Sequence, residues 1–162
     1  MEYYLSNVNT TDIESIQSLL LTTWKDTYIT RTEEQIEEIV ALFNSSSSLQ
    51  TELAKHYWKA YRLKSNKNIV GIITVVLHHN VIEIARLYIH PDHQRKHLGS
   101  KLIKKALAAY PLAEKVIVNV DVNNTSGRDF YFRQQFTEIK TEKVIKSGFA
   151  FELIVLEKVL KH

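Results

Sequence analysis

The sequence predicts an α/β or α+β fold, in which a central sheet carries helices on both faces. Three observations support this prediction. Strand and helix periodicities alternate along the chain in the order βααβββαβαββ. Capping patterns and proline or glycine breaks separate the segments. The 162 residues contain no linker, internal repeat or low-complexity tract, so residues 1–162 are expected to form a single domain.

The first third of the chain predicts one strand and two amphipathic helices. Two capping boxes, Thr11 with Glu14 and Thr32 with Gln35, mark helix starts, because each hydroxyl can accept a bond from a free backbone N–H. The expected segments are a strand at 2–8, a helix running to Trp24, a helix running to Phe43, a polar loop at 45–48 and another helical turn or two at 49–55.

The rest of the chain is rich in strands. β-branched and aromatic residues dominate these segments, and residues 116–122 alternate with a period of two. Pro91 ends one strand because proline donates no ladder hydrogen bond. The expected segments are strands at 56–63, 69–77, 81–89 and 116–122, a helix at 98–110, a short helix within 123–136 capped near Asn124 or Thr125, and a hairpin of strands 137–144 and 149–158.

Composition limits the class of protein. A hydrophobic content of 44% and a charged content of 24% are typical of globular domains. Cysteine is absent, which excludes disulfides and thiolate chemistry. No apolar run approaches the roughly 18 residues of a membrane span, and the start lacks a signal-peptide pattern, so a cytoplasmic location is expected. The net charge of +3 suits an anionic cofactor but is weak evidence for nucleic acid.

The turn from Gln94 to Ser100 carries the strongest functional signal. It opens a helix, and a helix start offers unpaired N–H groups and the positive end of the dipole, which can hold a pyrophosphate. Gly99 would let a ligand approach the backbone, while Arg95 and Lys96 add positive charge. An ordinary strand-to-helix connection with a solvated basic rim would share these features, so both interpretations remain open.

Two motifs resemble those of the GNAT superfamily of N-acetyltransferases, in the family's order and over nearly the whole chain. The resemblance implies a mixed, mostly antiparallel sheet of about seven strands. His97 replaces the first glycine of the acetyl-CoA motif, while Gly127 and Gln135 replace an alanine and a glycine of the late helix. The matching residues are Gln94, Arg95, Lys96, His97, Leu98 and Gly99 in the first motif, and Asn124, Gly127, Phe130, Tyr131, Gln135 and Phe136 in the second.

The resemblance implies an enzyme that moves the acetyl group of acetyl-CoA directly to a primary amine. Tyr131 would be the general acid that protonates the CoA thiolate, and Glu83 the base, acting through water. Two alternatives stay open. Tyr131 could be a core aromatic, and Glu83 could be a strand carboxylate paired with Arg86 or with a lysine.

The same resemblance implies a set of cofactor-binding residues. Backbone groups at the end of strand 81–89 would pair with the pantetheine arm. The set is Leu87, Tyr88, Ile89, Gln94, Arg95, Lys96, His97, Leu98, Gly99, Ser100, Asn124 and Arg133. No metal is expected: His90, His93 and His97 have ligand-like spacing, but Pro91 interrupts any helix across them, and solvated turn histidines are the simpler interpretation.

The amine acceptor is expected at the first two helices. A cationic amine, with a small polyamine as the first guess, would suit the aromatic and acidic side chains of Trp24, Tyr28, Glu34 and Glu38. The alternative is that these residues form an ordinary solvated helix face. A non-catalytic CoA-binding regulatory module of the same fold is the alternative function, because motif glycines are replaced. The expected partners are acetyl-CoA and a small amine, without nucleic acid or membrane; a homodimer is left open.

Overall fold

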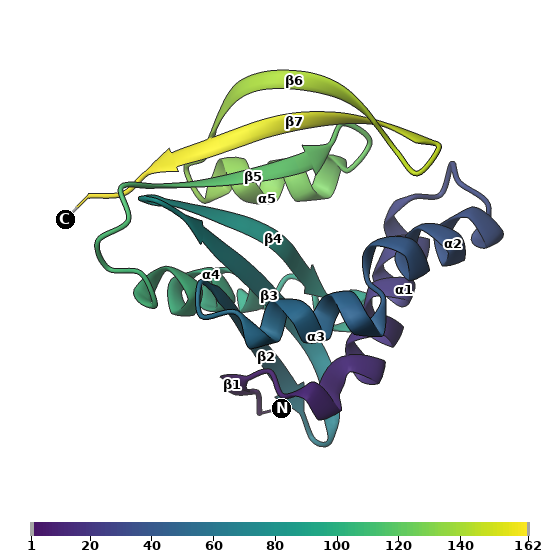
Figure 1. Ribbon diagram of the computed structural model, residues 1–162, viewed down its shortest axis with the longest axis horizontal. Helices are drawn as coiled ribbons and strands as arrows, with labels where there is room; N and C mark the ends of the chain where they lie inside the picture. Colours follow the sequence, from purple (N-terminus) through teal and green to yellow (C-terminus); the bar gives the residue numbers. More distant parts are fainter. Residues whose placement is uncertain (1, 162) are drawn as a thin grey trace.

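The computed structural model describes residues 2–161. Its seven strands form one sheet in the order β1-β2-β3-β4-β5-β7-β6, and only β4 and β5 pair in parallel. The predicted mixed, mostly antiparallel sheet is therefore confirmed. Figure 1 shows the sheet running through the molecule with helices packed along it. None of the helices in residues 2–161 combines the length and the apolar character that a membrane span needs.

The elements follow the predicted order, with one additional helix. The strands are β1 Tyr4–Asn7, β2 Trp58–Ser65, β3 Asn68–His78, β4 Val81–Ile89, β5 Lys115–Asp121, β6 Thr137–Lys146 and β7 Phe149–Val159. The helices are α1 Ile13–Thr27, α2 Glu33–Phe43, α3 Ser46–Ala54, α4 Leu98–Ala108 and α5 Thr125–Arg133, with 3-10 turns at Thr10–Asp12 and Pro91–His93.

Two apolar clusters pack on opposite faces of the sheet. Neighbouring residues on β3 show the division: Ile73 belongs to the cluster that contains α4, whereas Ile72 belongs to the cluster that contains α1, α2 and α3. Both isoleucines are fully buried. Because successive strand side chains point to opposite faces, α4 and α5 cover one face and the first three helices cover the other.

Two of the three predicted features at helix starts need correction. The box at Thr32 and Gln35 forms as predicted. The box at Thr11 and Glu14 is wrong, because the box starts two residues earlier. Asn9 is the N-cap, and the Asp12 carboxylate accepts a 2.8 Å bond from the backbone N–H of Asn9.

The polar loop predicted at 45–48 is also wrong, because it is the start of α3. Ser45 is the N-cap of this helix, and its hydroxyl accepts a bond from the backbone N–H of Ser48. Serine stabilises a helix start when its side chain satisfies a free N–H group. The run of serines therefore has the composition of a loop but the geometry of a cap.

β4 and β5 separate after four residue pairs. Their parallel pairing runs from Val81 with Lys115 to Ile84 with Val118. A bulge at Ala85 then shifts the register of β4 against β3. Beyond this point residues 86–89 pair only with β3, and residues 119–121 pair only with β7. Figure 1 shows the two strands spreading apart toward α1 and α2. This opening is called the wedge below.

A buried arginine joins the sheet to the first helices. Arg86 on β4 is 9% exposed, and its Nε donates to Oδ1 of Asn44 at 2.6 Å. Its Nη1 donates to Glu52 at 2.6 Å and to Oγ1 of Thr74 at 3.2 Å. The ends of α2 and α3 are thereby tied to β3 and β4. The sequence-based alternative in which Arg86 pairs with Glu83 is wrong.

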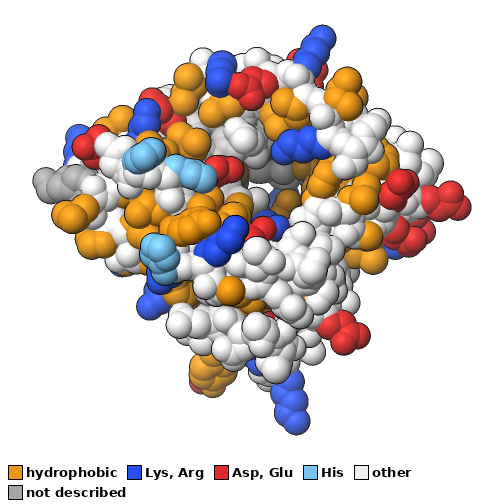
Figure 2. Space-filling model, viewed as in Figure 1, with side chains coloured by type: hydrophobic (Ala, Val, Ile, Leu, Met, Phe, Trp, Pro, Cys, Tyr) orange, Lys and Arg blue, Asp and Glu red, His pale blue; other side chains and the backbone are white. Residues whose placement is uncertain are grey.

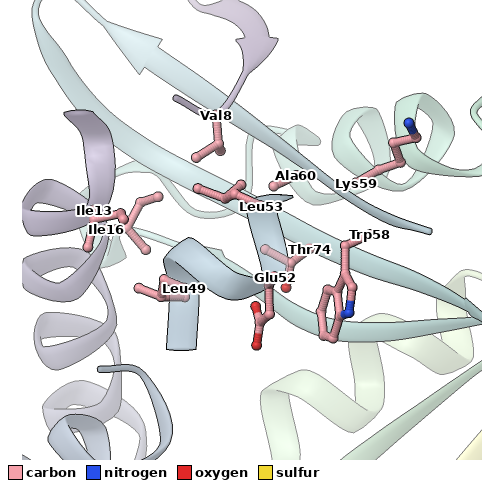
Figure 3. A pocket seen from close by; sticks show the side chains of 10 residues that line it. All are labelled: Val8, Ile13, Ile16, Leu49, Glu52, Leu53, Trp58, Lys59, Ala60 and Thr74. Carbon is pink, nitrogen blue, oxygen red and sulfur yellow. The ribbon is translucent and has the colours of Figure 1, made fainter. Parts of the chain in front are cut away.

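A cavity of about 20 Å³ lies beside this network, between α1, α3 and the strands β2 and β3 (Figure 3). Its lining is mainly apolar, with Glu52 and Thr74 contributing polar groups. The lining residues are Val8, Ile13, Ile16, Leu49, Glu52, Leu53, Trp58, Lys59, Ala60 and Thr74. A cavity of this size has room for about one water molecule, so we regard it as a packing void.

Glu52→Ala should destabilise the protein by about 3 kcal/mol, because it leaves the Arg86 guanidinium buried without its counter-ion. Glu38→Ala, on the exposed side of α2, is the matched control and should change the free energy of unfolding by less than about 0.5 kcal/mol. Urea unfolding of both variants measures the difference. Equal stabilities would mean that the Arg86 network contributes nothing measurable.

Candidate active site

The wedge brings side chains from both faces of the sheet together. Figure 2 shows this side of the molecule hollowed near its centre, with acidic and basic side chains at the rim of the hollow. In the view of Figure 1 the same region lies beside β4, where the strand leaves β5. Backbone groups of β4 that face β5 have no strand partner there, so an extended ligand could pair with them.

Aromatic residues from α1 and β4 line one side of the wedge. The rings of Trp24 and Tyr28 lie 4.4 Å apart, and Nε1 of Trp24 donates to the hydroxyl of Tyr88 at 3.2 Å. Burial raises the pKa of Tyr28 far above its usual value, and a hydrogen bond to Asn124 opposes this only weakly. The structure thus places two predicted acceptor residues beside two predicted cofactor-binding residues.

Tyr131 reaches the wedge from the other face. It is 6% exposed, and its ring packs edge-on against Phe130 and Phe136, with centroids 5.1 and 5.2 Å away. Burial, with a smaller contribution from Tyr88, raises the pKa of its phenol well above the usual range. Tyr131 belongs to the α4–α5 cluster, whereas Tyr88 packs with α1. The two tyrosines therefore belong to opposite faces of the sheet.

Glu83 lies at the closed end of the wedge, where β4 still pairs with β5. Its side chain is 33% exposed, and a carboxylate oxygen lies 3.0 Å from Nε2 of His78. Glu83 is therefore a partly exposed strand carboxylate, as one of the two predicted alternatives stated. Its partner, however, is His78 and not Arg86 or a lysine. A role as water-mediated base remains a prediction.

The predicted anion-binding turn is exposed at the start of α4. Gln94, Arg95, Lys96 and His97 all lie at the surface. The Gln94 side chain donates to the carbonyl of Ile89 at 3.0 Å, which ties the turn to the end of β4. Positive charge and free helix N–H groups therefore coincide at one end of the wedge.

The residue at the motif's first glycine position adopts a left-handed conformation. His97 is the N-cap of α4, with φ 59° and ψ 21°. Gln135, which replaces the glycine of the second motif, also has a positive φ, of 70°. Glycine adopts this region without the steric cost that other L-residues carry, so both replacements leave local strain.

Gly99 has a packing role that was not predicted. A Cβ atom added there would lie 2.9 Å from Cζ of Phe130. The glycine therefore makes room for an aromatic ring of α5 and not only for a ligand. Ser100 also contacts this helix, because its Oγ accepts a 2.8 Å bond from Gln134. The start of α4 and the helix that carries Tyr131 are packed together.

Several of the predicted site residues lie at the surface. Arg133, Glu34 and Glu38 are exposed on their helices. Within residues 2–161 no three His, Asp or Glu side chains are grouped closely enough to hold a metal ion. Nδ1 of His93 instead lies 2.9 Å from the hydroxyl of Tyr3.

Three residues in this region were not predicted from the sequence. Arg31 stacks over Phe151 at 4.8 Å and donates to the carbonyl of Ala150 at 2.8 Å, so it ties the α1–α2 loop to the β6–β7 hairpin. Nε of Arg128 on α5 is buried, with no hydrogen-bond partner in the described part of the chain. Asp121, at the end of β5, is 8% exposed. Only the assembled sheet reveals these positions.

The comparisons with known proteins agree with this geometry. A GNAT acetyltransferase domain model matches residues 27–154. PaiA N-acetyltransferase from Thermoplasma acidophilum, solved in complex with coenzyme A, superposes with a TM-score of 0.81 at 21% identity, covering 99% of this chain and 100% of that one. The ribosomal-protein-S18-alanine N-acetyltransferase from Escherichia coli gives 0.75 at 13% identity, covering 99% and 96%.

A curated relative matches a smaller part of the chain. The UPF0157 protein YqkA of Bacillus subtilis is 30% identical over 80 residues, which are 49% of this chain and 23% of that protein. The chain thus spans about a quarter of the length of this relative. The fold is an α/β domain with a mixed sheet and helices on both faces. The domain match covers most of the chain, which belongs to the GNAT acetyltransferase family.

His97→Gly should stabilise the protein by about 0.5 kcal/mol. It removes a left-handed cost of about 1–2 kcal/mol but adds about 0.5–1 kcal/mol of unfolded-chain entropy. The melting temperature should rise by about 1–2 °C. Lys96→Gly in the same turn, where φ is not positive, is the control and should give no gain. A lower melting temperature for His97→Gly would contradict the strain argument.

Stability should fall as the pH rises above about 10. Burial raises the pKa values of Tyr28, Tyr88 and Tyr131, so these phenols stay neutral in the folded protein while they ionise in the unfolded chain. The contribution of these neutral phenols to the free energy of unfolding is complete below about pH 10 and is lost at higher pH. Tyr131→Phe should flatten the decline in melting temperature between pH 9 and 11. Identical slopes would show that Tyr131 titrates normally.

Proposed function

We propose that this protein transfers the acetyl group of acetyl-CoA to a primary amine of a small cationic acceptor, with a polyamine as the first candidate. One observation supports this most directly. Tyr131 and Tyr88 belong to apolar clusters on opposite faces of the sheet, and β4, which carries Tyr88, leaves β5 after Ile84. A neutral phenol at the point where a thioester would lie can protonate a leaving thiolate.

The described residues fit the cofactor. The open edge of β4 at residues 85–89 could pair with the pantetheine arm, and the start of α4, with Arg95 and Lys96, could hold the pyrophosphate. The unpartnered Nε of Arg128 suits a ligand that supplies an acceptor atom. The coenzyme A complex of the Thermoplasma relative is consistent with this assignment.

The proposed reaction is a direct transfer. The neutral amine attacks the thioester carbonyl, and free N–H groups of β4 can stabilise the oxyanion of the tetrahedral intermediate. When the intermediate collapses, the C–S bond breaks and Tyr131 gives its proton to the CoA sulfur. Burial keeps this phenol protonated near neutral pH. Glu83, with His78 beside it, would accept the proton of the amine through water.

The acceptor is proposed to enter past α1 and α2. Trp24 and Tyr28 offer aromatic faces on which an ammonium group can rest. Glu34 and Glu38 are exposed on α2 and would attract a cation from solution. Arg31 closes the other side by joining the α1–α2 loop to the hairpin. A small polyamine matches this combination of aromatic and acidic groups.

Tyr131→Phe should lower the rate of acetyl transfer by about 10²–10⁴-fold, because it removes the proposed general acid. The ring still fills its place against Phe130 and Phe136, so acetyl-CoA affinity should change little. Pre-steady-state thiol release with a polyamine, peptide and aminoglycoside panel measures the chemical step. An unchanged step would remove Tyr131 from the mechanism.

Thermal shift measurements provide the control for cofactor binding. Acetyl-CoA at 100 times its dissociation constant should stabilise wild type and Tyr131→Phe alike, by about 2.7 kcal/mol. If wild type shows no shift at millimolar acetyl-CoA, the cofactor assignment is wrong. A shift without turnover of any amine would favour a non-catalytic CoA-binding module.

A further inference from the structure

Asp121 is a buried charge without an ion-pair partner among residues 2–161. Three charged residues in the described chain are buried: Asp12, Arg86 and Asp121. Asp12 pairs with Arg62, and Arg86 pairs with Glu52. Among residues 2–161, no Lys, Arg or His nitrogen lies within ion-pair distance of the Asp121 carboxylate. The only hydrogen bond recorded to this carboxylate there comes from the backbone N–H of Asn123, at 2.9 Å.

The position of Asp121 relates this charge to the wedge. It ends β5, beyond the last residue pair with β4, and pairs only with Leu153 of β7. Val118 and Val120 point into the α4–α5 cluster. By strand alternation, Asp121 faces the other side, where Tyr28 and Tyr88 lie. Its charge acts on the Tyr28 hydroxyl, which also interacts with Tyr88.

An uncompensated buried carboxylate is costly, because water no longer solvates its charge fully. The two other buried charges show how this fold satisfies such groups when they are structural. A positively charged ligand would supply the counter-ion that the described residues do not provide for Asp121. The nearby rings of Trp24, Tyr28 and Tyr88 add surfaces that favour a cation. An anionic ligand would be repelled at this point.

We propose that Asp121 is the counter-ion that binds an ammonium group of the acceptor within the wedge. This inference rests on the proposed function and adds to it a residue that determines specificity. The chemical class it selects is an aliphatic amine that is protonated in solution. The exposed glutamates of α2 would attract such a cation from a distance, whereas Asp121 contacts it beside the reacting atoms.

Asp121→Asn tests the proposal, because the amide removes the charge but keeps an oxygen for the Asn123 N–H. The Michaelis constant for 1,4-diaminobutane should rise about 10- to 100-fold, as expected when a charged hydrogen bond is lost. Acetyl-CoA affinity should stay close to that of wild type, and the melting temperature should be equal or higher, because the uncompensated buried charge is removed. Asp129→Asn, the same chemical change at an exposed position of α5, is the control and should leave all values unchanged.

The possible outcomes separate the two claims. Equal Michaelis constants for Asp121→Asn and Asp129→Asn would overturn the role of Asp121 and leave acetyl transfer intact. If wild type acetylates neither 1,4-diaminobutane nor any other aliphatic amine, the proposed function fails and the inference fails with it. Should Asp121→Asn not fold, Asp121→Ser, which also keeps an acceptor for Asn123, takes its place under the same criterion.

Discussion

The structure depends on the early end of the pairing between β4 and β5. A parallel pair normally continues along both strands, but here the bulge at Ala85 turns β4 away after four residue pairs. The sheet stays continuous at one end and opens at the other. Tyr28 and Tyr88 belong to one face of the sheet and Tyr131 to the other, whereas Glu34, Glu38 and Arg133 are exposed on their helices.

The helices on either side hold the opening in place. Arg86, directly after the bulge, anchors β4 to α2 and α3 through Asn44 and Glu52. On the other side, Phe130 fits against Gly99 and packs on Tyr131. The backbone edge and the phenol therefore rest on separate, well-packed supports. Such supports give a site the fixed geometry that group transfer requires.

Local patterns allowed much of the fold to be predicted from the sequence. Periodicity identified the strands, and Thr32 and Asn124 were recognised as caps because a cap depends on only three or four neighbouring residues. Ser45 was missed because its serine neighbours have the composition of a loop. The motif at Gln94–Gly99 indicated the correct family, although His97 departs from it.

Long-range geometry explains what could not be predicted. Asp121 lies in an ordinary alternating strand, and nothing nearby in the sequence shows that it is buried without a cation. Arg31 contacts Ala150, 119 residues away. The approach of Phe130 to Gly99 could not be predicted, because it depends on how two helices pack. These features arise from tertiary contacts, for which a single sequence contains no local signal.

The two ends of the sheet have a consequence for self-association. Free strand edges invite pairing with another chain, and natural proteins limit this with short or lysine-bearing edge strands. β1 has four residues, and β6 exposes Lys140, Lys143 and Lys146. Joining two copies through β6 would bring these lysines toward one another. Both edge strands of the sheet thus carry features that limit edge-to-edge pairing.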